Sequence, residues 1–160
     1  MTKRILLWML FMALFFSCSD EKIHQGKPSI KVEPLNLVFK TVNIGESDRR
    51  SVVLRNEGTA TLKITSISLQ AEPVFEILKL DEEDFSRIPF PINIPPPLTG
   101  ENNVRTLEIR FGAQQLGQYS GKIVVASNDP RQPTIEVSLD GVCSVPDIEV
   151  EPPQLDFGSV

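Results

Sequence analysis

Histidine and cysteine, the side chains that most often support nucleophilic catalysis and zinc binding, are almost absent from this chain of 160 residues. His24 is the only histidine, and Cys18 and Cys143 are the only cysteines. A Ser-His-Asp or Cys-His arrangement needs a histidine held by the fold, and a zinc site needs several His or Cys ligands. Because His24 lies in a short polar stretch before the expected domain, neither kind of site is predicted.

Carboxylates remain as candidates, and the densest group is Asp81, Glu82, Glu83 and Asp84. Hard cations bind carboxylate oxygens, so a weak calcium site is one interpretation of this group. A solvated acidic loop is the other, and it is favoured because adjacent carboxylates repel one another and their spacing matches no calcium loop. We therefore expect no metal, no cofactor and no catalytic residue.

Several polar residues and glycines are better explained by turn geometry than by chemistry. Asn and Asp side chains bond to nearby backbone, glycine tolerates positive φ, and proline fixes φ at the start of a turn. The residues predicted to form turns are Gly45, Asn56, Gly58, Gly117, Asn128, Asp129, Pro130 and Gly141.

Residues 1–17 have the composition of a signal peptide and are set aside from the fold. Lys3 and Arg4 precede an unbroken apolar run at 5–16, which is shorter than the roughly 20 residues that span a bilayer. Ser17-Cys18-Ser19 follows and resembles the lipobox of bacterial lipoproteins. The resemblance implies that Cys18 is acylated and becomes the first residue of the mature protein. Cleavage after Ser19, which would release a soluble protein, is the alternative.

The same resemblance implies an exported protein that is lipid-anchored to a membrane. Ser19 stands where an Asp usually signals retention in the inner membrane, so the outer membrane is favoured. Residues 18–27 are short and polar and are predicted to be a tether. Without Lys3 and Arg4 the chain has 14 basic and 21 acidic side chains, which disfavours nucleic acid as a partner. The expected partners are the membrane, through Cys18, and an unidentified protein.

A long-period repeat decides the expected domain boundaries. Residues 28–42 return 118 positions later as residues 146–160, with eight of fifteen positions identical and no gap. A fixed period marks one folding unit copied in tandem. We therefore predict a single domain over 28–145 and the truncated start of a second like unit over 146–160, poorly packed against the first. Strand addition of this tail to an exposed edge is the alternative.

The domain itself shows apolar residues in period-two alternation, punctuated by turn signals and without a helical stretch, which predicts an all-β sandwich. A register change suggests a β-bulge near Thr65-Ser66, and Gly141 is expected to end the last strand. The proline-rich segment 81–105 is expected to be irregular. The residues predicted to form the core are Phe39, Val52, Leu54, Leu62, Ile64, Leu107, Ile109, Phe111, Tyr119, Ile123, Val125, Ile135, Val137 and Leu139. Cys143 is expected to fill a small buried or half-buried site.

Ordered motifs along the chain carry a family resemblance. They read Leu37-x-Phe39-x-x-Val42-x-x-Gly45, Val52-x-Leu54-x-Asn56-x-Gly58, Leu107-x-Ile109-x-Phe111, Gly117-x-Tyr119-x-Gly121-x-Ile123 and Ile135-x-Val137-x-Leu139-x-Gly141. This order resembles a broad immunoglobulin-like family that includes major sperm protein-like, abnormal-spindle and hydin modules and bacterial choice-of-anchor tandem repeats. The resemblance implies an immunoglobulin-like sandwich of seven to nine strands without common catalytic residues.

These observations predict a non-enzymatic, membrane-tethered module that acts as a structural spacer or a protein-interaction domain in the bacterial cell envelope. Contacts are expected at exposed edge strands and at the proline-rich loop from Asp81 to Glu101. A glycan- or peptidoglycan-binding module is one alternative, although the chain offers few aromatic residues for a sugar platform. A carboxylate-dependent hydrolase is the other, and it would need two acids facing each other across a cleft.

Overall fold

The computed structural model describes residues 26–145. The predicted signal peptide 1–17, the lipidation site Cys18, most of the tether and the tail 146–160 therefore lie outside the described residues. Within the described part, no helix is long and apolar enough to cross a membrane.

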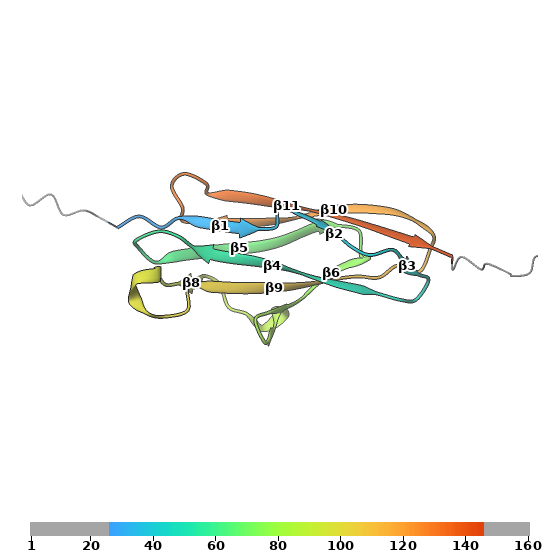
Figure 1. The fold of residues 1–160 in the computed structure, drawn as a ribbon, viewed down its shortest axis with the longest axis horizontal. Coiled ribbons are helices and arrows are strands. Elements are labelled where there is room, and N and C mark those ends of the chain that lie inside the picture. Colours follow the sequence, from blue (N-terminus) through green and yellow to red (C-terminus); the bar gives the residue numbers. More distant parts are fainter. Residues whose placement is uncertain (1–25, 146–160) are drawn as a thin grey trace, which may run out of the picture.

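Two β-sheets pack face to face in an immunoglobulin-like sandwich (Figure 1). One sheet has the order β1-β4-β9-β6-β7, and the other has the order β2-β11-β10-β5-β8 with β3 beside β11. The strands are β1 (Ile30–Glu33), β2 (Asn36–Val38), β3 (Val42–Asn43), β4 (Asp48–Asn56), β5 (Leu62–Ala71), β6 (Phe75–Leu80), β7 (Glu83–Asp84), β8 (Ile92–Ile94), β9 (Val104–Phe111), β10 (Gly117–Ser127) and β11 (Thr134–Ser144). Short 3₁₀ helices are η2 (Phe85–Arg87) and η3 (Pro97–Thr99).

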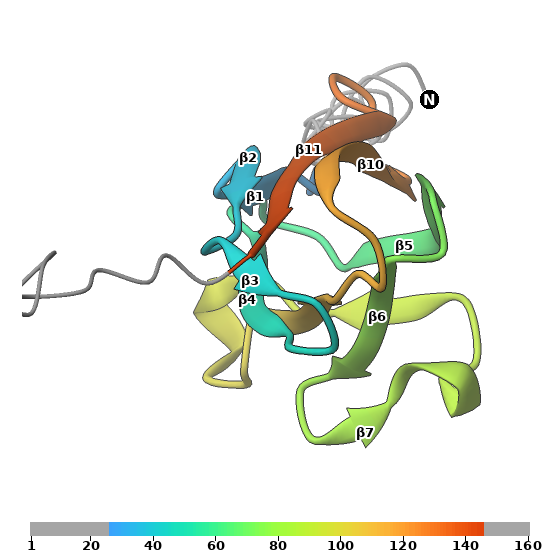
Figure 2. The same ribbon diagram turned by 90° about the vertical axis from the view of Figure 1, so that its right-hand side faces the viewer.

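The first strand is divided between the two sheets by proline, which cannot donate to a sheet ladder. β1 pairs antiparallel with β4, whereas β2 pairs parallel with β11 in the other sheet. Pro34 lies between them and follows a cis peptide bond with Glu33. Figure 2, which looks along the long axis, shows this crossover at one side of the sandwich. Such divisions, together with the two-residue strands β3 and β7, raise the strands in the described part above the expected seven to nine.

Side-chain alternation along each strand builds one core between the sheets. Of the residues predicted for this core, all are buried except Tyr119 and Ile135, which are partly buried and pack against it. The rings of Phe39, Phe75 and Phe111 lie with centroids 5.1 to 5.7 Å apart and form its aromatic part.

Three local expectations have clear outcomes. The bulge is confirmed, because Ser127 pairs with Ile64 and Ala126 pairs with Ser66, which leaves Thr65 without a partner. The prediction that Gly141 ends the last strand is wrong, since β11 continues to Ser144. Gly141 is buried within β11. A larger residue does not fit there, because an added Cβ would lie 2.7 Å from the Phe111 ring.

The expectation of an irregular 81–105 segment is only partly right. It contains β7, which pairs with β6, and two 3₁₀ helices, as well as the extended β8. The last proline of its Pro-Pro-Pro run begins η3 and so leaves the extended conformation.

The two ends of the sandwich carry different loops, and β1 begins at one end while β11 ends at the other (Figure 1). We call the first end the N-terminal pole; it holds the connections 57–61, 95–103 and 128–133. The second end is the C-terminal pole; it holds the connections 44–47 and 112–116 and the end of β11.

Candidate docking site

A groove runs along the side of the sandwich where the chain crosses from β1 to β2. It has a volume of about 790 Å³ and is lined by Ile30, Lys31, Val32, Glu33, Pro34, Leu35, Gln132 and Ile135. Its floor is apolar, because Ile30 and Val32 belong to the core and Ile135 is only partly covered. Leu35, at one end of the groove, is 56% exposed. A concave, mostly apolar surface of this kind is the usual form of a binding site.

One wall of the groove is a free stretch of strand edge on β11. Ser138 N donates to Leu35 O at 2.9 Å, and Phe39 N donates to Asp140 O at 2.9 Å, so these residues of β11 face β2. Because backbone groups alternate along a strand, Thr134 and Glu136 point their N–H and C=O groups to the same side. Pairing with β2 begins only at Ser138, so no strand covers the edge at Thr134–Glu136 within residues 26–145.

The other wall, β1, is partly closed by a buried carboxylate. Asp129 is 2% exposed, and its Oδ2 accepts from Ile30 N at 2.8 Å, on the side of β1 that faces away from β4. Its Oδ1 accepts from Arg131 N at 2.8 Å and from Gln132 N at 3.3 Å. Burial alone would raise the pKa of Asp129, but the three N–H donors and the charge of Arg131 more than offset it and hold the pKa below its ordinary value.

Asn128 and Pro130, the two neighbours of Asp129, have unequal roles. Asn128 lies in the β10–β11 connection, as predicted, but the expected bond of its side chain to nearby backbone is wrong. Its Oδ1 accepts from Lys63 N at 2.8 Å and its Nδ2 donates to Thr61 O at 3.4 Å. It therefore ties the end of β10 to β5, on the far side of the sheet from the groove. Pro130 is exposed in the β10–β11 connection.

Asn56 is a second buried polar residue that the turn interpretation underestimated. Its Oδ1 accepts from Gly58 N at 2.9 Å, which is the expected local turn bond. Its Nδ2 also donates to Ala60 O and to Ile94 O, both at 2.9 Å. Asn56 is fully buried and so joins β4 to β8 across the two sheets at the N-terminal pole. Gly58 has no room for a Cβ, because the backbone of Lys27 lies against it.

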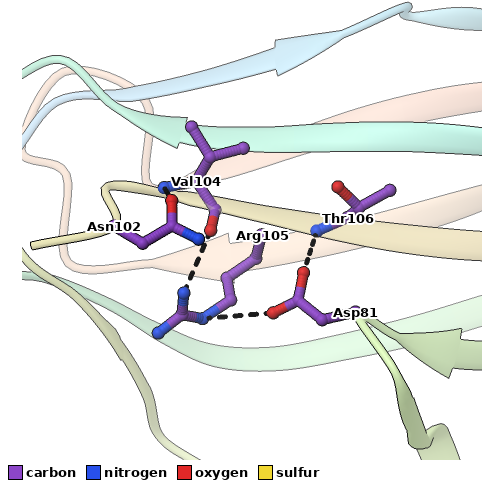
Figure 3. Close-up of polar contacts among 5 residues, drawn as sticks. All are labelled: Asp81, Asn102, Val104, Arg105 and Thr106. Carbon is purple, nitrogen blue, oxygen red and sulfur yellow. Dashed lines mark hydrogen bonds and ion pairs between the residues drawn. The ribbon is translucent and has the colours of Figure 1, made fainter.

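The proline-rich segment closes the opposite side of the sandwich rather than presenting an open edge (Figure 3). β6 ends at Leu80, opposite Leu107, so β9 is left without a strand partner on that side at Thr106 and Val104. Asp81 takes the place of a strand at Thr106: Asp81 N donates to Thr106 O at 2.6 Å, and Thr106 N donates to Asp81 Oδ1 at 2.8 Å.

Side chains complete this closure at Val104, the next outward-facing residue of β9. Val104 N donates to Asn102 Oδ1 at 3.0 Å, and Arg105 Nη1 donates to Val104 O at 3.0 Å. Arg105 Nε also lies 3.6 Å from Asp81 Oδ2, and its side chain is 25% exposed. The outward backbone groups of β9 are therefore occupied by the protein itself.

The acidic group does not act as one cluster. Asp81 binds Thr106, whereas Asp84 Oδ1 accepts from the N and Oγ of Ser86 at 2.9 and 2.7 Å and thereby caps η2. These two hydrogen bonds from Ser86 lower the pKa of Asp84. Among residues 26–145, no group of three or more His, Cys, Asp or Glu side chains is arranged to hold a metal ion.

The remaining predicted turn and thiol positions lie mostly at the C-terminal pole. Gly45 has φ 83 in the β3–β4 turn, a conformation that favours glycine. Gly117 opens β10. Cys143 is buried on β11, and its Sγ lies 4.0 Å from Ala113 O.

Comparison with protein families places the domain among immunoglobulin-like modules. The family model described as "HYDIN/CFA65/VesB-like, Ig-like domain" matches residues 28–142. No curated protein matches the chain.

Solved structures with this fold come from unlike proteins. The ASH/PapD-like domain 7 of human CEP192 has a TM-score of 0.50 and 17% identity, covering 74% of this chain and 87% of that domain. A Porphyromonas gingivalis W83 protein of unknown function has a TM-score of 0.53 and 15% identity, covering 72% of this chain and 47% of its own. A family 123 glycoside hydrolase from Clostridium perfringens has a TM-score of 0.52 and 11% identity, covering 74% of this chain and 27% of the enzyme. The chain thus spans less than half of the latter two, and the likeness concerns the fold alone.

Proposed function

The chain belongs to the HYDIN/CFA65/VesB-like Ig-like domain family, and from that premise we propose that it is a non-enzymatic interaction module that binds an extended segment of a partner protein along the free edge of β11. The fold is that of a structural or interaction module. The observation that carries the proposal is the uncovered edge at Thr134–Glu136 beside an apolar groove.

The groove geometry supports strand addition. An extended peptide gains main-chain hydrogen bonds from an exposed edge and specificity from pockets for alternate side chains. The outward N–H and C=O groups of Thr134 and Glu136 supply the first requirement. The groove floor of Ile30, Val32 and Ile135 supplies the second, because it would accept every other side chain of the segment. We therefore expect the bound segment to be extended, with apolar residues at every second position.

In the proposed setting the module is tethered to the bacterial envelope through lipid on Cys18, with residues 18–27 as the spacer. The support for this part is the sequence alone: the apolar run at 5–16 and the Ser17-Cys18-Ser19 motif. Labelling with palmitate tests it. We expect the full chain to be labelled and membrane-bound and the Cys18→Ala chain to be neither, whereas membrane binding of an unlabelled chain would contradict the lipid tether.

Blocking the β11 edge tests the interaction itself. Glu136→Pro removes the outward N–H and fills the edge with a ring. Because both backbone groups of Glu136 point away from β10, the substitution removes no ladder bond to that strand. Glu136→Val is the matched control, because it keeps the N–H but loses the 2.7 Å ion pair with Lys122. A photo-crosslinking residue at Thr134 of the full chain, expressed in cells, would report the partner segment by mass spectrometry.

We expect the wild-type and Glu136→Val chains to crosslink the same partner segment. Glu136→Pro should lower the yield about tenfold, as expected from the loss of roughly one main-chain hydrogen bond. Equal yields from Glu136→Pro and wild type would overturn the edge-binding proposal, as would crosslinks only to glycan.

A further inference from the structure

Three exposed apolar residues lie close together in the strand register at the C-terminal pole. Ile44 follows β3, Val145 follows β11, and Leu116 precedes β10, each by one residue. They are 52%, 61% and 54% exposed, respectively. We call these three residues the C-terminal apolar row.

Strand register makes these residues neighbours. Asn43 pairs with Ser144 and Gly117 pairs with Cys143, so β11 lies between β3 and β10 at this end. One step further along, Ile44 is level with Val145, and Leu116 is level with Ser144 on the other side of β11. The loops that carry the row are fixed, because Gly45 N donates to Ala113 O at 3.2 Å and Asn43 Nδ2 donates to Glu46 Oε2 at 3.0 Å.

The N-terminal pole shows how a unit of this kind begins. Lys27 N donates to Thr59 Oγ1 at 3.1 Å, and Thr59 N donates to Lys27 O at 2.8 Å. The residue just before Pro28 is therefore already part of the folded pole. At the 118-residue period, the residue equivalent to Lys27 is Val145 itself.

We propose that a like unit beginning at Pro146 stacks end to end on this domain without a flexible linker, so that its N-terminal pole covers the C-terminal apolar row. Val145 would serve both units, as the residue after β11 in the first and as the counterpart of Lys27 in the second. At the same period, Ile148 is the counterpart of Ile30, the first residue of β1. Ser144, which ends β11, and Ile148 are four residues apart in the chain and so at most about 14 Å apart, which would hold the two poles together.

The opposite pole offers a matching apolar group. Leu98, on η3 in the connection 95–103, is 87% exposed at the N-terminal pole. A like unit that carries its own counterpart of Leu98 would bring an apolar side chain toward Ile44 and Leu116. Contacts between unlike faces of this kind are head-to-tail and build linear arrays. The inference rests on the repeat and on the pole, and it is independent of what the β11 edge binds.

A two-unit chain tests the stacking. Residues 146–160 would be continued with a second copy of residues 43–145, which preserves the period. Residual dipolar couplings measured by NMR report whether the two units share one alignment. A Gly-Ser-Gly-Ser insertion after Val145 separates the units, and Ile44→Ser with Leu116→Ser in the first unit removes the apolar contact while leaving the linker length unchanged.

We expect one shared alignment in the two-unit chain, loss of it on insertion, and partial loss in the serine variant. A soluble paramagnetic probe should also enhance the relaxation of the Ile44 and Leu116 methyl groups less when the second unit is present. Independent alignment of the two units without the insertion would overturn the proposal. An unchanged shared alignment in the serine variant, together with Ile44 and Leu116 methyl groups that stay accessible to the probe in the unsubstituted two-unit chain, would overturn the role of the row.

Discussion

The two flanks of this sandwich differ in what happens to a strand edge that its neighbouring strand does not fully cover. On one flank β6 stops short of the beginning of β9, and on the other β2 does not reach the beginning of β11. Each leaves two outward-facing residues of a long strand without a strand partner. At β9 these are Val104 and Thr106, and side chains occupy both. At β11 these are Thr134 and Glu136, and within the described residues no side chain or strand takes that place.

Exposed strand edges are templates for pairing, and proteins usually blunt them with charges or covering segments. The β9 flank follows that rule, and it even holds Asp81 in the left-handed region at φ 54 to do so. A non-glycine residue there costs free energy, which the bonds between Asp81 and Thr106 offset. The difference shows that the segment 81–105, which is rich in proline and acidic residues, covers a strand edge. The beginning of β11 is the edge that stays available.

The largest expected effect comes from placing the same residue on both edges. Thr106→Pro removes the N–H that binds the Asp81 carboxylate and leaves that carboxylate without its donor, so it should lower the free energy of unfolding by about 3 kcal/mol. Glu136→Pro removes an N–H with no protein partner and should cost less than about 1 kcal/mol. Urea unfolding followed by circular dichroism measures both.

The proline comparison has an internal control. Thr106→Val and Glu136→Val keep the N–H and should each change stability by less than about 0.5 kcal/mol, because both are strand-compatible surface substitutions. Equal losses for the two proline variants would mean that the β11 edge is covered in solution, and the contrast between the flanks would fall.

The next largest effect concerns Asp129, which partly closes the β1 wall of the groove. Asp129→Ala leaves the buried Ile30 N–H without an acceptor, so we expect a loss of about 2 kcal/mol in the free energy of unfolding. Asp129→Asn keeps one acceptor oxygen and should lose about half as much. Faster hydrogen exchange at Ile30 but unchanged exchange at Thr106 would place the effect on the groove side. Equal acceleration at both amides would instead indicate global destabilisation.

Sequence patterns predicted the core well and the polar contacts poorly. Leu107, Ile109 and Phe111 alternate strictly because β9 has one face toward the core, so their burial follows from period two alone. Asp129 also looked like a turn residue, and it does bind Arg131 and Gln132 nearby. Its bond to Ile30, 99 residues away, has no local signature because it depends on how β1 is placed against the β10–β11 connection.

The same limit applies to the flanks. Asp81 was grouped with three neighbouring acids because adjacent charges suggest one solvated loop. Its actual role depends on Thr106, which only the ending of β6 brings beside it. The uncovered part of β11 was equally invisible, because a strand edge is free or paired according to the lengths of its neighbours. Alternation identifies which side chains face inward and says nothing of which backbone groups remain unpaired.

The smallest expected effect is a pH dependence that comes from Asp129 on the open flank. The pKa of Asp129 is lower in the folded protein than its ordinary value, so its ionised form stabilises the fold. That stabilisation is complete above the ordinary value near 4 and is lost as the pH falls toward and through the lower folded-state pKa. The difference in free energy of unfolding between the wild type and Asp129→Asn should therefore stay constant from pH 7 to about 5 and shrink below about 4. A wild-type advantage that grows as the pH falls would show that Asp129 is not held ionised by these donors, and the closed wall of the groove would need another explanation.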